Sequence, residues 1–195
     1  MIFLGDSITD ADHLFDTDGR DLGQGYVREI ANSLGPEAVV KNRGHNAYTA
    51  WQVDRALEGD CLHELPDEVT LLVGINDVSA YIGGAGGYDA AEYGQIMNRI
   101  LTRLTEAGAA PITVMEPFLF LEPEYYKLWE KIMSAFQEEA KRAAESHGAR
   151  WIPLAEIFRK KCEDLPIEEF STDGVHLTDL GHAIVAREWL TYGRR

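Results

Sequence analysis

The chain alternates short apolar runs with longer segments in which apolar residues recur at helical spacing. The apolar runs cover residues 1–5, 38–41, 69–73, 112–115 and 150–154. This alternation predicts strands joined by helices, the pattern of a parallel sheet with helices on both faces. The run at 69–73 is the strongest sign, because a strand covered on both faces is apolar along most of its length. The sequence therefore predicts an open five-stranded parallel α/β sheet.

Amphipathic patterns predict four longer helices. They cover residues 25–34, 93–104, 124–147 and 178–192. One face of the third carries Tyr125, Leu128, Ile132, Phe136, Ala140 and Ala143. In the last, Leu180, Ile184 and Trp189 are expected to face the core. Thr178 is the predicted N-cap of this helix.

No repeat, linker or low-complexity tract divides the 195 residues. The glycine-rich stretch at 83–87 is typical of a loop inside a domain rather than of a boundary between two. We therefore expect a single domain spanning residues 1–195.

The charge balance limits the partners of the chain. Lys and Arg number 18 against 33 Asp and Glu, which gives a formal net charge of −15. Such a chain repels a phosphate backbone and an anionic lipid surface. We therefore expect a neutral small-molecule substrate, no nucleic-acid partner and no membrane.

The sequence shows no signal peptide and no apolar stretch of the roughly 20 residues that a membrane span needs. Cys61 and Cys162 lie far apart and lack Cys-x-x-Cys spacing. A disulfide between them stays open, but reduced thiols are favoured. These features predict a cytoplasmic protein.

Polar segments follow the predicted strands at residues 5–10, 42–46 and 74–77, and another lies at 171–176. In open α/β sheets, ligands bind beyond the carboxyl ends of the strands. Ser7 stands at a strand-to-helix turn, where its hydroxyl projects into the cleft and its N–H is free to stabilise an oxyanion. A serine in this position is a candidate nucleophile, and the alternative is a helix cap.

His176 is the candidate general base for Ser7. Asp173 precedes it by three residues in a glycine-containing turn, close enough to accept from the imidazole and fix its tautomer. The alternative is that Asp173 caps a turn and His176 lies on the surface. His182 is a weaker candidate, because no Asp precedes it at comparable spacing in a flexible turn.

Gly44 and Asn76 are candidates to complete an oxyanion hole with the Ser7 N–H, one through its backbone and the other through its amide. The alternatives are a turn at Gly44 and a helix cap at Asn76. Asp77 is expected to support its loop. No His-x-x-x-His pair or other zinc-ligand spacing occurs, so we expect neither a metal nor a cofactor.

Taken together, these segments resemble the GDSL lipase/esterase family, also called the SGNH hydrolases. The matching blocks are Gly5-Asp6-Ser7, Asn42-Arg43-Gly44, Gly74-Ile75-Asn76-Asp77 and Asp173-Gly174-Val175-His176. They follow the family's order over nearly the whole chain. The resemblance implies a flavodoxin-like three-layer α/β/α sandwich. It also implies a triad of Ser7, His176 and Asp173, with Ser7, Gly44 and Asn76 at the oxyanion hole.

Further stretches resemble the carbohydrate-deacetylating branch, in particular intracellular proteins similar to acetylxylan esterases. They are residues 22–27, 74–78 and the pair Pro117-Phe118. The chain departs from the pattern at Ala47, where many relatives carry a second glycine, which bears on the loop that holds Gly44. It also departs in the short stretch before Gly5.

The resemblance implies hydrolysis of short acyl esters, first of all acetyl esters of a sugar. Six aromatic residues are candidates to line a cleft and stack on sugar rings: Trp51, Tyr81, Tyr88, Phe118, Phe120 and Trp129. Core positions are the alternative for each. The rival functions are a lysophospholipase or thioesterase, a non-catalytic carbohydrate-binding protein and a phosphodiesterase, the last disfavoured by the acidic balance. Homo-oligomers are common among such enzymes.

Overall fold

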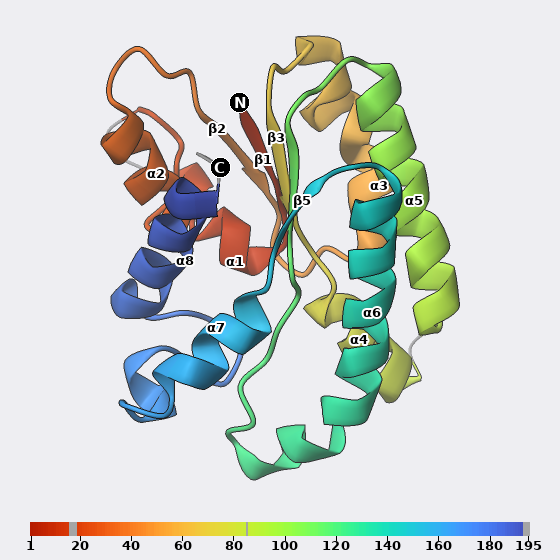
Figure 1. Ribbon diagram of the computed structural model, residues 1–195, viewed down its shortest axis with the longest axis vertical. Helices are drawn as coiled ribbons and strands as arrows, with labels where there is room; N and C mark the ends of the chain where they lie inside the picture. Colours follow the sequence, from red (N-terminus) through yellow and green to blue (C-terminus); the bar gives the residue numbers. More distant parts are fainter. Residues whose placement is uncertain (16–18, 85, 193–195) are drawn as a thin grey trace.

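The computed structural model describes residues 1–15, 19–84 and 86–192, and five parallel strands form its single sheet (Figure 1). The strands are β1 (Ile2–Gly5), β2 (Lys41–Gly44), β3 (Val69–Leu72), β4 (Ile112–Met115) and β5 (Arg150–Ile152). Their order is β2-β1-β3-β4-β5, which is the flavodoxin-like order. The predicted five-stranded parallel α/β fold is confirmed.

Helices cover both faces of the sheet. The α-helices are α1 (Ser7–Asp10), α2 (Tyr26–Leu34), α3 (Ala50–Asp60), α4 (Ile75–Gly83), α5 (Ala90–Glu106), α6 (Glu130–Ser146), α7 (Leu154–Lys161) and α8 (Asp179–Tyr192). Short 3₁₀ turns are η1 (His13–Phe15), η2 (Leu62–Glu64), η3 (Glu124–Leu128) and η4 (Ile167–Glu169). In Figure 1, α2, α7 and α8 lie on one side of the sheet and α3, α5 and α6 on the other. This is the predicted three-layer arrangement.

The register of the sheet brings three strand ends together. Gly5 at the end of β1 pairs with Gly44 of β2 on one side and with Leu72 of β3 on the other. A Cβ at position 5 would lie 2.4 Å from the Leu72 carbonyl oxygen, and one at position 44 would lie 2.2 Å from the Asp10 backbone nitrogen. Only glycine fits at these two positions, and the short helix α1 can therefore pack directly on the ends of β1 and β2.

The prediction for the second strand is wrong by three residues. It placed the strand at 38–41, whereas β2 spans Lys41–Gly44. Of the apolar residues that suggested the earlier position, Val39 is 70% exposed and Val40 is only half-buried against the core. β2 is an edge strand that buries the polar Asn42, whose amide donates to the carbonyl oxygens of Thr9 and Leu22. Because the prediction looks for apolar runs, it misses a strand whose buried residue is polar and hydrogen bonded.

Two helix predictions also need correction. The single helix predicted at 124–147 is a 3₁₀ turn, η3, followed by α6. Because the two elements have different numbers of residues per turn, Tyr125 and Leu128 do not continue the buried face of α6 and are 54% and 81% exposed. Leu180, predicted to face the core, is 40% exposed, whereas Ile184 and Trp189 are buried as expected. The Thr178 hydroxyl accepts from the Gly181 N–H at 3.2 Å, which caps α8 as predicted.

Two further expectations bear on particular residues. The stretch at 83–87 includes the end of α4 and a left-handed cap at Gly84, and Ala85 lies outside the described residues. Both cysteines are free thiols, Cys61 buried and Cys162 half-buried. Over the described ranges, no helix combines the length and apolarity that a membrane span requires.

Candidate active site

Ser7 is the first residue of α1 and follows β1 after one intervening residue. That residue, Asp6, is buried and caps α1, because its carboxylate accepts from the Ile8 N–H at 3.0 Å. The tight turn holds Ser7 at the carboxyl edge of the sheet. Its Oγ lies 3.0 Å from Nε2 of His176, which is 169 positions later in the chain.

His176 is oriented by Asp173 through a short hydrogen bond. Nδ1 of His176 lies 2.6 Å from Oδ2 of Asp173, and Oδ1 of the same carboxylate accepts from the N–H groups of Val175 and His176 at 2.9 and 2.8 Å. Since Nδ1 donates to the carboxylate, Nε2 is left to accept the hydroxyl proton of Ser7. The structure thus brings all three predicted triad residues together in one chain of contacts.

The electrostatics of Asp173 suit a permanently ionised group. Partial burial raises the pKa of this carboxyl, but hydrogen bonds from the His176 ring and from the N–H groups of His176 and Val175 outweigh it. The net pKa of Asp173 lies below its usual value. An ionised carboxylate here stabilises the imidazolium that forms when His176 takes a proton.

His182, the weaker candidate base, has a different role. It is buried, and its Nδ1 accepts from the Tyr26 backbone N–H at 3.2 Å. Burial lowers the pKa of this imidazole to about 4; the Asp179 carboxylate opposes the shift and His176 adds to it. His182 is therefore a neutral packing residue at the junction of α2 and α8.

Asn76, in the first turn of α4, faces the loop that joins β2 to α3. Its Nδ2 donates to the Tyr48 carbonyl oxygen at 3.0 Å. This amide carries two hydrogens, and the second has no partner among the described residues. Asn76 is thus placed as a donor beside the loop, rather than as a helix cap.

Gly44 is placed differently from the prediction. Its N–H donates to Oδ1 of Asn42 at 2.9 Å, and its carbonyl oxygen lies 3.1 Å from Nε2 of His13. The Gly44 amide is therefore already used within the protein. Its evident role is the close contact of β2 with α1, for which a side chain leaves no room.

Ala47 offers the backbone donor that Gly44 does not. Its N–H has no hydrogen-bond partner in the part of the chain that the structure describes, and neither has that of Ser7. Ala47 has φ 61°, a left-handed conformation that costs a residue with a Cβ about 1–2 kcal/mol. The neighbouring Asn46 lines the same cavity as Ser7 and His176. In the sequence, Ala47 stands out only as a departure from the family pattern, because residue type does not reveal whether a backbone N–H has a partner.

Two buried carboxylates lie behind these groups. Asp77 accepts from the Ala50 N–H at 2.9 Å and from the Tyr88 hydroxyl, which ties the start of α4 to the start of α3. Burial raises the pKa of Asp77 to about 6 and that of Asp6 to about 7. Asp77 supports the loops around the site, as the sequence predicts.

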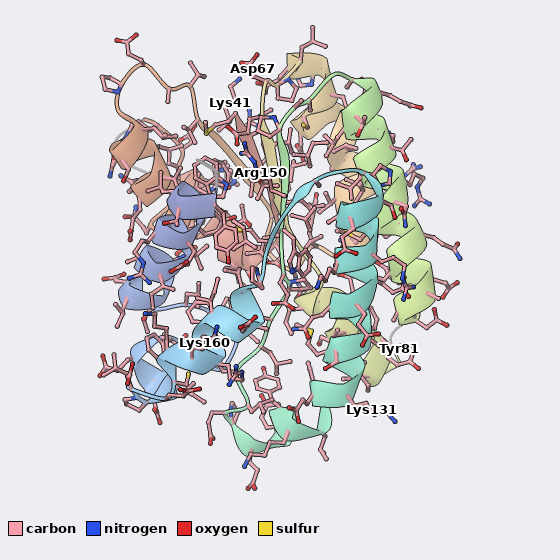
Figure 2. All side chains as sticks on the ribbon, in the orientation of Figure 1. Lys41, Asp67, Tyr81, Lys131, Arg150 and Lys160 are labelled. Carbon is pink, nitrogen blue, oxygen red and sulfur yellow. The ribbon has the colours of Figure 1, made fainter. Side chains whose placement is uncertain are left out.

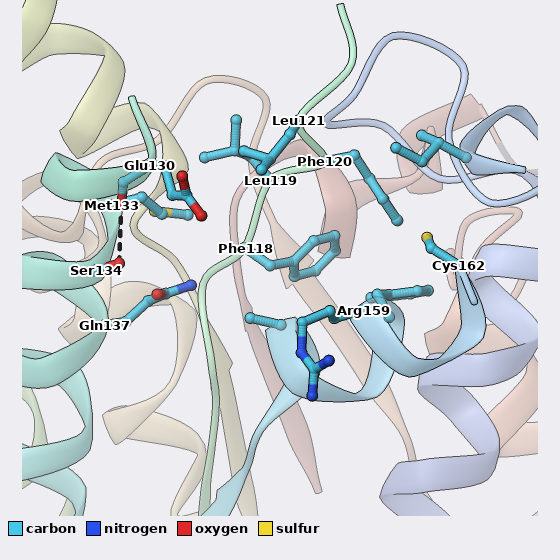
Figure 3. Close-up of a pocket in the computed structure, with 13 residues that line it drawn as sticks. Phe118, Leu119, Phe120, Leu121, Glu130, Met133, Ser134, Gln137, Arg159 and Cys162 are labelled. Atoms are coloured by element: carbon cyan, nitrogen blue, oxygen red, sulfur yellow. Dashed lines mark hydrogen bonds between the residues drawn. The ribbon is translucent and has the colours of Figure 1, made fainter. Parts of the chain in front are cut away.

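The cavity at Ser7 is polar and measures about 400 Å³. Its lining consists of Ser7, Ile8, Ala11, Asp12, Gln24, Asn46, His176, Leu177, Asp179 and His182. A second, mostly apolar cavity of about 310 Å³ lies between α6 and α7 (Figure 3). The two cavities share no residue. The apolar cavity is thus not an extension of the space at Ser7.

The six predicted stacking aromatics fall into three groups. Phe118 and Phe120 are core residues, 2% and 4% exposed, and both rings contact Phe158. Tyr88 and Trp129 are half-buried. Trp51 and Tyr81 are exposed, and Tyr81, a residue of α4, lies at the outer edge of the molecule in Figure 2. Trp51 lines a hollow of about 380 Å³ next to Thr49, directly after the loop that carries Ala47.

Within the described ranges, no three side chains of His, Cys, Asp or Glu come together as metal ligands would. What the geometry at Ser7 offers is a hydroxyl, an oriented imidazole and three donors in reach of one edge of the sheet. Such a set is suited to acyl transfer.

Comparison with known proteins identifies a family and similar folds. The model of the GDSL-like lipase/acylhydrolase family matches residues 3–184. An acetylxylan esterase of Geobacillus stearothermophilus is 27% identical over an alignment of 209 positions, and the alignment covers 97% of this chain and 91% of that protein. A catalytic mutant of the acetylxylan esterase Axe2 from the same organism has 24% identity and a TM-score of 0.86, over 98% of this chain and 92% of that one. LAE5, an α/β hydrolase from the metagenome of Lake Arreo, has 22% identity and a TM-score of 0.86, over 98% and 93%.

Proposed function

Because the chain belongs to the GDSL-like lipase/acylhydrolase family and is a carboxylic ester hydrolase, we propose that Ser7 is its nucleophile. His176 acts as the general base and Asp173 holds its ring. The observation that carries this proposal is the pair of contacts from Ser7 Oγ to His176 Nε2 at 3.0 Å and from His176 Nδ1 to Asp173 at 2.6 Å. Together they provide the proton acceptor that a serine hydroxyl needs before it can attack an ester.

The reaction proceeds through an acyl-enzyme. Ser7 attacks the ester carbonyl while His176 takes its proton, and a tetrahedral intermediate forms. His176 then gives the proton to the leaving alcohol, and the C–O bond of the ester breaks. Water repeats the sequence on the acyl-enzyme and releases the acid, which restores the Ser7 hydroxyl.

We assign the oxyanion to three donors, namely the N–H of Ser7, the amide of Asn76 and the N–H of Ala47. Ala47 takes the place that the sequence suggested for Gly44, because the Gly44 N–H is bound to Asn42. The Tyr48 carbonyl oxygen holds the Asn76 amide next to this loop. Removal of one such donor costs about 3–4 kcal/mol of transition-state stabilisation.

The proposed substrate is a short acyl ester, acetyl first, on a carbohydrate. The polar side chains around Ser7 suit a leaving group rich in hydroxyls, and the net charge of −15 disfavours an anionic one. The apolar cavity that could hold a long acyl chain shares no residue with the space at Ser7. The similar acetylxylan esterase supports the same substrate class.

The test is hydrolysis of p-nitrophenyl acetate, butyrate and octanoate, and of an acetylated xylo-oligosaccharide, with EDTA present. We expect the wild type to prefer acetate and Ser7→Ala to lose at least about 10³-fold in kcat. Ser33→Ala is the matched control, because among the described residues the Ser33 hydroxyl bonds only to the Glu29 carbonyl oxygen, within α2. An octanoate preference would move the substrate to lipids or thioesters. Full activity in Ser7→Ala would refute the nucleophile.

A further inference from the structure

The loop that carries Ala47 is anchored at its two ends. At the start, the His45 N–H donates to the Gly5 carbonyl oxygen at 3.0 Å, two residues before the nucleophile. At the end, the Tyr48 N–H donates back to the His45 carbonyl oxygen at 3.1 Å, and the Tyr48 carbonyl oxygen accepts from Asn76. The loop at 45–48 therefore touches both the strand before Ser7 and the amide assigned to the oxyanion.

The His45 side chain adds a second set of contacts to the same loop. Its Nε2 lies 2.8 Å from Oδ2 of Asp60, the last residue of α3. Its ring stacks on Tyr48 with centroids 4.4 Å apart and an angle of 29° between the planes. The His45 and Asp60 side chains are only 30% and 23% exposed, so solvent weakens their hydrogen bond less than it would at an open surface.

Between His45 and Tyr48 the backbone takes a turn that the residue type does not favour. Ala47 has φ 61° and a side chain exposed to solvent, so no packing of its own holds it there. A strained residue of this kind persists only where its surroundings fix it. Besides the backbone hydrogen bonds and the Asn76 amide at its ends, two side-chain contacts hold this turn, namely the His45–Asp60 bond and the His45–Tyr48 stack.

We propose that His45 is a positioning residue for the reaction, which fixes the loop so that the Ala47 N–H is aimed at the oxyanion. This proposal rests on the acyl transfer proposed above. The imidazole donates from Nε2 to Asp60 and stacks on Tyr48. Together these contacts hold the turn between His45 and Tyr48 in one conformation. His45 does not touch the reacting atoms.

The experiment compares three variants with p-nitrophenyl acetate as substrate. His45→Ala removes both contacts, His45→Phe keeps a ring that can stack on Tyr48 but loses the bond to Asp60, and Asp60→Asn keeps an oxygen that can accept from Nε2. We expect kcat to fall about tenfold in His45→Ala with KM unchanged, because a misplaced donor weakens binding of the transition state alone. His45→Phe should lie between, and Asp60→Asn close to wild type.

His63→Ala is the matched control, because the His63 side chain is exposed and, in the part of the chain that the structure describes, bonds only to the Glu58 carbonyl oxygen. Its kcat should equal that of the wild type. Thermal unfolding of every variant shows whether it is folded at the assay temperature. A kcat unchanged in both folded His45 variants would overturn the proposal, as would a loss of activity that appears in KM alone.

A second comparison separates positioning from general damage. Glycine adopts positive φ freely, so in an Ala47→Gly background the conformation of the loop depends less on the contacts of His45 with Asp60 and Tyr48. We expect His45→Ala to cost several-fold less in kcat there than in the native background. Equal losses in both backgrounds would overturn the proposal. Failure of the proposed function is distinguishable, since it would show as full activity in Ser7→Ala.

Discussion

Thr70 and Thr113 are paired residues of β3 and β4 and both are buried, yet within the described ranges only the Thr70 hydroxyl is hydrogen bonded. The Thr70 hydroxyl accepts from the indole N–H of Trp189 at 2.8 Å. The Thr113 hydroxyl has no partner among the described residues. A buried hydroxyl is stabilising only where it is hydrogen bonded.

Thr70→Val should therefore destabilise the protein by about 1–3 kcal/mol, because it leaves the Trp189 N–H buried without an acceptor. Thr113→Val removes an unpaired hydroxyl at the same depth and should be neutral or stabilising by up to about 1 kcal/mol. Urea unfolding of the two variants provides the measurement. Equal destabilisation by both would mean that the bond to Trp189 contributes nothing.

Gly174, between Asp173 and His176, is a position where the triad depends on the absence of a side chain. It has φ 92°, and a Cβ there would lie 2.0 Å from the Glu122 carbonyl oxygen. We expect Gly174→Ala to cost roughly 2–4 kcal/mol in stability and about 100-fold in kcat, because the turn that aligns Asp173 with His176 must shift.

Gly148 serves as the control for this prediction. It has φ 63° but no heavy atom within 4 Å of an added Cβ. Gly148→Ala should cost only the backbone strain, about 1 kcal/mol, and leave kcat unchanged. Thermal unfolding and ester hydrolysis measure both effects. If Gly174→Ala kept wild-type kcat, the turn would not control the triad.

The sequence predicts the central part of this fold well because the central strands are apolar almost throughout. The run at 69–73 contains one polar residue, Thr70, whose hydroxyl is hydrogen bonded by Trp189, far along the chain. β2 was misplaced for the opposite reason, since Asn42 is buried by bonds to loops that the sequence does not reveal as neighbours. Sequence patterns therefore fail to predict a strand where its polar residues are buried through hydrogen bonds to distant parts of the chain.

The same limit applies to the site. The order of the polar segments predicted which side chains meet, because Ser7 lies within hydrogen-bond distance of His176 and His176 within hydrogen-bond distance of Asp173. The backbone donor could not be predicted in this way. Whether the N–H of Gly44 or of Ala47 is free depends on the Asn42 side chain and on a φ angle, neither of which the residue type specifies.

Trp51 is the exposed aromatic best placed to meet a sugar ring. It is 51% exposed and lines a hollow directly after the loop at 45–48. On an acetylated xylo-oligosaccharide, Trp51→Ala should raise KM about five- to tenfold through loss of stacking, and on p-nitrophenyl acetate it should leave KM unchanged. Tyr81→Ala, which removes another exposed ring, should change neither value. An equal rise in KM on both substrates would argue against a sugar contact at Trp51.

Asp6 predicts a dependence of stability on pH. Burial raises its pKa from 3.8 to about 7; the Asp77 carboxylate adds to the shift, whereas the Ile8 N–H and His176 oppose it. Between about pH 4 and pH 7 the folded state therefore binds more protons at Asp6 than the unfolded state does. Because stability falls with rising pH wherever the folded state holds more protons, this carboxyl stabilises the fold fully below pH 4 and loses that contribution as pH rises through about 7.

Asp6→Asn keeps an oxygen for the Ile8 N–H and cannot ionise. The difference in unfolding free energy between wild type and Asp6→Asn should therefore shift against the wild type by a few kcal/mol between pH 5 and pH 8. Urea unfolding of both proteins at the two pH values measures it, and the comparison cancels the carboxyls that do not interact with Asp6. The Asp77 carboxyl, which interacts with Asp6 and has a pKa of about 6, contributes to the same difference. A difference that stays constant with pH would mean that Asp6 is ionised throughout, and that the capping bond to Ile8 outweighs the cost of its burial.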